Sequence, residues 1–302
     1  MKLGPRAGAA YATAAFACAA LQSSTAVAAE PAVPIEDPYA VPPVPRPPTL
    51  PELTHSDIEA TLESTVGTIL PNGSGAPVGA YVQRVNVEVP LAVRRWYVGA
   101  TFEMAAGHGP VVGSNLVIDG RTLWATRTGL AFGGGVGLIV PTAQFVGDGP
   151  ASMAALDAGT LRPWDVSFFN PGAIGGRPFI DVRAIDGPFV VQFREGLDVT
   201  TSTVPGGAPI SVYATAGLYL GLWATPHVAV GFEAFESYAI DVPGIRDGDR
   251  ASVVVSPNVR LVLPLIEPAI SMFTSIGTPL QGANSNIWGF RLAFTLVLPG
   301  SP

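Results

Sequence analysis

The sequence predicts an all-β protein, and three of its properties support this prediction. Only 13% of the 302 residues are charged, where roughly 25% is usual in soluble domains, and the mean hydropathy is +0.39. The chain contains 35 glycines and 30 prolines, which break up long apolar helices. From residue 80 onward, apolar residues alternate with small or polar ones, which is the period of a β-strand. These properties favour a transmembrane antiparallel β-barrel, in which the apolar face of each strand meets lipid.

The first 29 residues have the layout of a secretory signal peptide. Lys2 and Arg6 precede a short apolar stretch, and small residues up to Ala29 offer cleavage sites. The only cysteine, Cys18, lies within this segment. Lipidation of Cys18 is the alternative, but it requires a Leu-type residue three positions earlier, where the chain has alanine. We therefore expect export, cleavage near Ala29 and localisation in the bacterial outer membrane.

Two segments separate the signal peptide from the first expected strand. Residues 30–53 are rich in proline, which predicts an extended, disordered spacer without a packed core. Residues 54–79 predict a short amphipathic helix and a linker, because Ser56 and Glu59 have the spacing of a capping box. The apolar residues Ile58, Leu62 and Val66 recur at every fourth position, as on one face of a helix. This helix would either plug or abut the barrel.

Residues 80–302 are predicted to form the barrel. Eleven strands are expected near residues 80–90, 94–105, 114–125, 129–140, 178–185, 188–197, 209–223, 227–239, 251–264, 268–276 and 286–298. The dipeptide Asp186-Gly187 is a strong hairpin signal between two of them. Single-chain bacterial barrels have an even number of strands. We therefore predict twelve, with ten as the alternative if residues 268–276 do not make a full crossing.

The residues on the two faces of these strands favour a barrel over a secreted, soluble β-sandwich that binds sugars or surfaces. The expected inward face is rich in Gly, Ala, Ser, Thr, Tyr and Arg, which suits a crowded lumen better than an open surface. Aromatic residues fall near strand ends, as the interface girdles of a membrane barrel require. The aromatic residues assigned to the lipid interface are Trp96, Trp124, Trp223 and Trp288.

The glycine-rich stretch "GLAFGGGVGLIVPTA" (residues 129–143) raises the question of a phosphate-binding loop. A Walker loop needs a lysine after its glycines, and Lys2 is the only lysine in the chain. The dinucleotide fingerprint fails too, because Leu138 stands where its last glycine is required. Gly133, Gly135 and Gly137 instead occupy alternate positions, which predicts the inner face of a strand. We expect them to leave room for bulky neighbours such as Tyr213 or Tyr219.

A long loop, residues 141–176, is expected between two strands. It contains "ASMAALDAG", which predicts one or two helical turns. With twelve strands this should be a surface loop that folds over or into the pore.

The expected inward face carries many ionisable side chains. They pair to neutralise charge, form a constriction that selects solutes by charge, or do both. The candidate lumen and selectivity residues are Arg95, Glu103, Asp119, Arg121, Asp181, Arg183, Arg194, Glu233, Arg260, Arg291, Tyr213 and Tyr219. A barrel of ten to twelve strands lies between the filled eight-stranded and the open sixteen-stranded types. The sequence therefore predicts a narrow or plugged pore for small solutes.

Other functions have weaker support. An enzyme embedded in the barrel would need a base near Ser or Asp, but His55, His108 and His227 have no such partner by spacing. No metal-binding or cofactor motif is found, so we expect neither. A formal net charge of −7 argues against nucleic acid as a partner. A non-conducting structural or surface-binding barrel remains the main alternative to a pore.

The C-terminal stretch "NIWGFRLAFTLVLPGSP" resembles the terminal strand of bacterial outer-membrane β-barrels. The stretch from Gly135 to Ala143 is similar to strand-to-loop junctions of porin-like barrels. The resemblance implies outer-membrane lipid and the barrel-assembly machinery as partners, the latter through the C-terminal strand. One departure is that this chain continues through Leu298 to Pro302, whereas the family usually ends on an aromatic residue.

Overall fold

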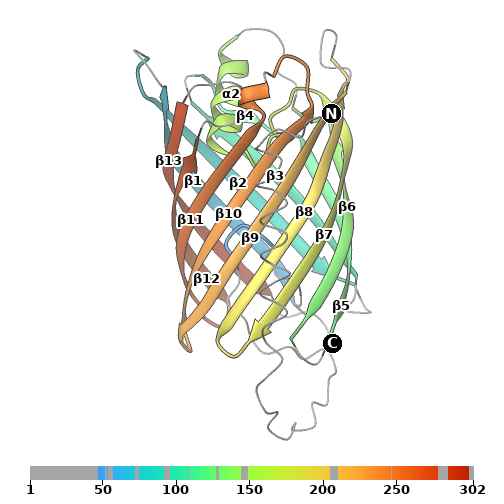
Figure 1. The fold of residues 1–302 in the computed structure, drawn as a ribbon, viewed down its shortest axis with the longest axis vertical. Helices are drawn as coiled ribbons and strands as arrows, with labels where there is room; N and C mark the ends of the chain where they lie inside the picture. The colour runs from blue at the N-terminus through green and yellow to red at the C-terminus, as the bar shows by residue number, and fades with distance from the viewer. Residues whose placement is uncertain are drawn as a thin grey trace, which may run out of the picture.

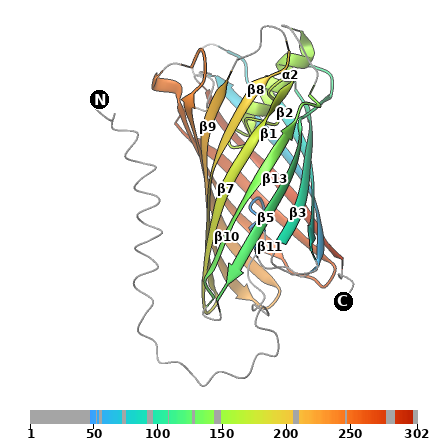
Figure 2. The same ribbon diagram turned by 90° about the vertical axis from the view of Figure 1, so that its right-hand side faces the viewer.

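The computed structural model describes residues 47–51, 53, 57–71, 75–91, 96–107, 109–126, 129–143, 149–204, 210–245, 247–277 and 285–298. They form a barrel of long tilted strands with a helix at one end (Figures 1 and 2). The strands are β1 (Ile58–Pro71), β2 (Val78–Pro90), β3 (Trp96–Ala106), β4 (Val112–Gly113), β5 (Leu116–Ala125), β6 (Ala131–Val140), β7 (Ala173–Asp186), β8 (Phe189–Ser202), β9 (Ser211–Thr225), β10 (Val228–Asp241), β11 (Ala251–Leu261), β12 (Ile266–Ile276) and β13 (Ser285–Leu298). The helices are α2 (Pro150–Leu161) and the single turn η1 (Asp247–Asp249). Neither helix of the described residues is long and apolar enough to cross a membrane.

The barrel is closed by the first and last strands. β1 pairs antiparallel with β13 from Ile58↔Leu298 to Pro71↔Ser285, and on its other edge with β2. The two-residue β4 pairs only with β3, so it is a side branch. Twelve long antiparallel strands therefore make the wall, which confirms the predicted twelve-stranded barrel.

The twelfth strand is β1, where the sequence predicted a helix. The helix prediction for residues 54–79 is wrong, and the barrel begins at Ile58, not at residue 80. The reason is that a recurrence at every fourth residue is also a recurrence at even spacing, which a strand places on one face. Leu62 and Val66 are exposed on that face, while Glu63 and Thr65 are buried on the other. Hydrogen bonding to β2 on one edge and to β13 on the other stabilises these residues as a strand.

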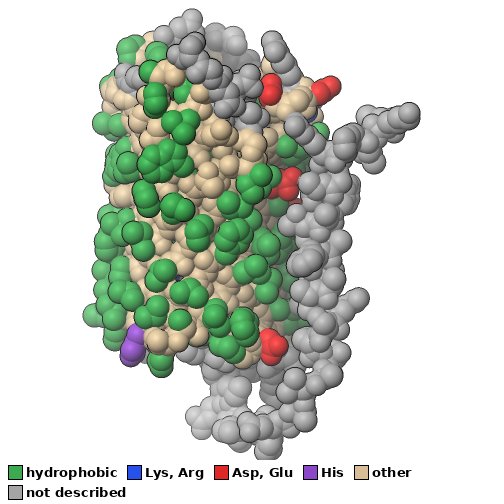
Figure 3. Space-filling model, turned by 60° about the vertical axis from the view of Figure 1, so that its left-hand side comes forward, with side chains coloured by type: hydrophobic (Ala, Val, Ile, Leu, Met, Phe, Trp, Pro, Cys, Tyr) green, Lys and Arg blue, Asp and Glu red, His purple; other side chains and the backbone are tan. Residues whose placement is uncertain are grey.

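The two faces of the wall differ in composition. On the face that Figure 3 shows, hydrophobic side chains are spread over most of the height of the barrel and few charged side chains appear. Trp96, Trp124 and Trp288 are 53%, 56% and 44% exposed on this surface. Trp223 instead shares the inward face with its buried partner Ala229, so the structure does not place it among the outward aromatics.

The glycine-rich stretch lies in strand β6, as predicted. A Cβ atom at Gly135 would lie 2.3 Å from the carbonyl oxygen of Gly120 and 2.6 Å from Cζ of Phe179. The bulky neighbour is therefore Phe179, and the expected role of Tyr213 or Tyr219 there is wrong. The ring of Tyr219 occupies the space over Gly221.

The two ends of the barrel have connections of different length. At the end where β1 begins and β13 finishes, β7 and β8 are joined only by residues 187–188, and β9 and β10 only by residues 226–227. At the other end lies the connection from β6 to β7, which contains α2 (Figure 1). In outer-membrane barrels the short turns are periplasmic and the long loops extracellular.

The long loop was predicted to span residues 141–176. It ends earlier, because β7 begins at Ala173.

Candidate functional site: the barrel interior

The interior contains a cavity between two inserted parts of the chain. Its empty volume, including the part open to solvent, is about 1350 Å³. We call residues 150–169 the outer plug and residues 47–51 together with residue 53 the N-terminal insert. Both contribute to the cavity lining, together with side chains from the barrel wall. Solutes entering the barrel would meet these two segments.

The outer plug is fixed by Arg162, which follows α2. Its guanidinium is fully buried, forms an ion pair with Glu63 of β1, and donates to Thr65 at 2.9 Å. It also donates to Asp165 at 2.7 Å and lies 3.5 Å from Glu103 of β3. One arginine of the plug thus joins two strands of the wall. Three carboxylates surround it, which compensates for the cost of burying its charge.

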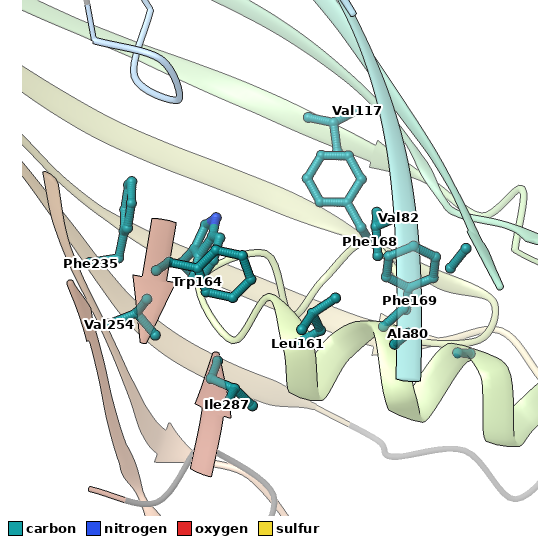
Figure 4. Close-up of a cluster of buried hydrophobic side chains, with 14 of the residues drawn as sticks. Ala80, Val82, Val117, Leu161, Trp164, Phe168, Phe169, Phe235, Val254 and Ile287 are labelled. Carbon is teal, nitrogen blue, oxygen red and sulfur yellow. The ribbon is translucent and has the colours of Figure 1, made fainter. Parts of the chain in front are cut away.

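Aromatic side chains continue the outer plug across the lumen. Trp164 stacks on Phe235 of β10 at 4.9 Å between ring centroids and meets Phe273 of β12 edge to face at 5.9 Å. Figure 4 shows Trp164 beside Phe235, with Leu161 at the end of α2. Such pairs contribute beyond the area they bury. The plug is therefore held by apolar packing as well as by ion pairs.

Asn115 anchors the end of the outer plug. This fully buried side chain donates to the carbonyl oxygens of Ser167 at 3.0 Å and Asn170 at 2.7 Å. Its own carbonyl oxygen accepts from the backbone N–H of Ala143. One amide thereby fixes both ends of the segment that contains α2.

Asp165 faces the cavity from the outer plug. Burial would raise the pKa of this carboxyl, but Arg162 first, then Arg84 and Arg177, lower the pKa below its ordinary value. Arg84 of β2 lies 3.5 Å from Asp165 and keeps 17% of its side chain exposed. Asp165 is therefore ionised at neutral pH and contributes negative charge at this level of the lumen.

The N-terminal insert crosses the other half of the lumen. Figure 1 shows it as the blue loop inside the barrel. The backbone N–H of Thr49 donates to Glu233 at 3.0 Å, and Gln192 donates to the carbonyl oxygen of Pro51 at 2.9 Å. Leu53 is fully buried against Tyr97 and its neighbours. This part of the predicted disordered spacer is therefore packed inside the barrel, because wall side chains satisfy its backbone polar groups.

Several other predicted charges form ion pairs along the wall. Arg121 donates to Glu88 at 2.9 Å, Arg194 to Asp181 at 2.7 Å, and Arg260 to Glu267 at 2.9 Å. Arg291 donates to Glu233 at 2.7 Å. The buried members of the predicted lumen set are Glu103, Arg121, Asp181, Arg183, Glu233, Arg260, Arg291, Tyr213 and Tyr219. Arg194 is one-quarter exposed and Asp119 lines the cavity. Arg95 lies outside the described residues.

Asp119 differs from the other carboxylates that face the lumen. It has neither an ion pair nor a hydrogen bond to another described residue. Its strand β5 places it opposite Gly99, whose missing side chain leaves space for the carboxylate. Asp119 is therefore the carboxylate most available to a cation in the cavity.

Sequence reasoning missed several residues of this interior. Arg84 and Arg177 lie on strands and alternate with outward residues, so strand parity could have identified them. Asn115 has the parity of Asp119 and Arg121 within the expected strand 114–125, so it could have been identified in the same way. Arg162 and the N-terminal insert gave no such signal, because loops have no period. Of the three histidines, His227 lies in an exposed turn, while His55 and His108 fall outside the described residues. Within the described ranges no cluster of His, Cys, Asp and Glu has the arrangement of a metal site.

Comparison with solved structures identifies the architecture. The fold is similar to an outer membrane channel from Pseudomonas putida F1, with a TM-score of 0.60 and 11% identity over 88% of this chain and 100% of that one. The chain has an outer-membrane, porin-like barrel fold. It is also similar to the NanC porin, with a TM-score of 0.52 and 9% identity over 78% of this chain and 98% of that one. No family model and no curated protein matches the sequence. At such low identities the likeness concerns the fold alone.

Proposed function

We propose that this protein is a narrow outer-membrane channel for the passive movement of small solutes. The observation that carries the proposal is a closed barrel with an apolar exterior and a charged, partly open interior cavity. The two similar structures are described as a channel and a porin, which supports the same function. The wide lumen of a general porin is not expected, because the outer plug and the N-terminal insert occupy much of the cross-section.

The envelope location belongs to the same proposal. Residues 1–29 would direct export, the apolar outer wall would lie in outer-membrane lipid, and β13 would be recognised by the barrel-assembly machinery. The protein should then pellet with outer membranes and migrate differently on a gel before and after boiling. A soluble protein with unchanged mobility would contradict this location.

Planar-bilayer recording of the refolded protein tests conduction. We expect small unitary currents and slow leakage of small solutes from liposomes. Insertion with neither current nor leakage would favour the second candidate, a structural or surface-binding barrel. That candidate is supported by the same two inserted segments, which narrow the lumen.

The lumen charges named above are proposed to set selectivity. Asp119→Asn should shift the reversal potential in a salt gradient toward less cation preference, because it removes the most available carboxylate of the cavity. Asp186→Asn, at the exposed end of β7, is the matched control and should leave the reversal potential unchanged. Equal effects of the two substitutions would exclude Asp119 from the conduction path.

A further inference from the structure

We propose that the lumen contains a binding site for an extended, proline-containing peptide, occupied in this protein by its own N-terminal insert. The site shares wall residues with the proposed selectivity set, but its partners are backbone groups of a peptide. The inference does not depend on the channel conducting solutes.

Hydrogen bonds to the backbone of the insert come from around the barrel. The carbonyl oxygens of Pro47, Pro51 and Leu53 accept from Arg260 at 3.3 Å, Gln192 at 2.9 Å and Arg121 at 3.4 Å, respectively. These donors lie on β11, β8 and β5. The wall thus holds the segment at three carbonyl groups spread along its length, as a receptor holds an extended peptide.

The chemistry of the wall matches a proline-rich chain. Proline has no backbone N–H, so a segment containing several prolines presents mainly carbonyl acceptors. Arginine offers several donors and no acceptor, which complements such a segment. The N–H of Thr49 is met by Glu233, and its hydroxyl lies 3.3 Å from the same carboxylate. Thr49 also accepts from Arg291.

Two leucines of the insert fit into the wall. Leu53 is 0% exposed in a cluster with Tyr97 and Leu123. Leu50 is 8% exposed beside Gly217, where a Cβ atom would lie 2.9 Å from its Cδ2 atom. The wall therefore recognises side chains of the insert as well as its backbone. A peptide with the same residues in another order should bind poorly.

The arginines present donors without uncompensated charge. Arg121, Arg260 and Arg291 each form an ion pair with a wall carboxylate, namely Glu88, Glu267 and Glu233. Donors of this kind suit neutral backbone carbonyl groups, because the positive charge of each arginine is already neutralised. Tethering to β1 gives the insert a high effective concentration, so a free peptide must compete with it.

The test uses a fluorescent peptide with the sequence of residues 47–53, PPTLPEL, and the full-length protein in detergent. Leu53→Asp places a carboxylate in the apolar pocket and should release the insert, while the peptide retains its own leucine. We expect saturable binding to the variant, at least tenfold tighter than to the unsubstituted protein. The scrambled peptide LPEPTPL should not bind. Equal binding to both proteins, or of both peptides, would overturn the proposal.

Further substitutions locate the bound peptide. Added to Leu53→Asp, Gln192→Leu should weaken binding roughly fivefold, which is the effect of one lost hydrogen bond. Ser237→Ala removes a buried hydroxyl that has no hydrogen-bond partner among the described residues, and should have no effect. Unchanged affinity in the Gln192→Leu protein would place the peptide elsewhere.

A second measurement covers the case in which Leu53→Asp does not fold, as judged by heat-modifiable gel mobility. Leu50→Cys is smaller and uncharged, and a maleimide should label its thiol slowly because the position is buried. Peptide PPTLPEL at high concentration should accelerate labelling severalfold by displacing the insert. No acceleration, or the same acceleration by the scrambled peptide, would overturn the proposal. Peptide binding without conductance would leave the site intact and end the proposed channel function.

Discussion

At single positions, the packing of the interior depends on where side chains are absent. Gly135 and Gly134 are neighbours in β6, yet only Gly135 faces the lumen. A Cβ atom at Gly135 would meet Phe179 and the backbone of Gly120, whereas at Gly134 the nearest atom would be 3.4 Å away. The glycine run is thus a packing requirement on one face of the strand and dispensable on the other.

Gly135→Ala should destabilise the barrel by about 1–3 kcal/mol, because an added methyl group overpacks a close contact between strands. Gly134→Ala should change the free energy of unfolding much less. Urea unfolding in lipid or detergent, followed by the heat-dependent gel shift, measures both. A larger effect at Gly134 would mean that the inward and outward faces of β6 are reversed.

At the level of elements, the loop between β6 and β7 is part of the interior. Arg162 and Asp165 form an ion pair with i,i+3 spacing that is buried against β1 and β3. Arg250 and Asp247 form a pair with the same separation, but Asp247 is 98% exposed. The chain therefore offers an internal comparison of one interaction in two environments.

Arg162→Leu should cost about 3–5 kcal/mol, since it leaves buried carboxylates without their cation. It should also loosen the outer plug, so single-channel current should rise. Asp247→Asn, which removes the exposed pair and leaves the hydrogen bonds of Arg250 to the carbonyl oxygens of Ala239 and Ile240, should alter neither stability nor current measurably. Equal currents in Arg162→Leu and the unsubstituted protein would show that the outer plug does not limit flow.

At the level of the whole molecule, the unequal connections at the two ends give the barrel an orientation. The long connections and α2 lie at one end. The short turns lie at the other end, where β1 begins and β13 finishes. By the general rule for outer-membrane barrels, the long-loop end faces the outside of the cell. The N-terminal insert then contacts residues such as Gln192, close to the periplasmic turn that precedes β8.

Cysteine labelling in intact cells checks this orientation. The only native cysteine is Cys18, inside the predicted signal peptide, so the unsubstituted protein should give no background. Asp247→Cys should react with an impermeant maleimide on whole cells, because it is exposed in a long-end connection. His227→Cys, in a short turn, should react only after lysis. The opposite labelling pattern would mean that the barrel has the opposite orientation in the membrane.

The sequence by itself determined the repeating part of this protein. Strand alternation fixes which side chains share a face, so the barrel, its glycine-rich strand and most inward charges, such as Glu103 and Arg291, could be predicted. The sequence pattern could not distinguish the strand β1 from a helix, because apolar residues spaced by four share a face in both. The hydrogen bonds from β2 and β13 favour the strand. Only the tertiary structure decided that residues near Thr49 and Arg162 enter the lumen. Their positions depend on partners far away in the chain, and no local period encodes such contacts.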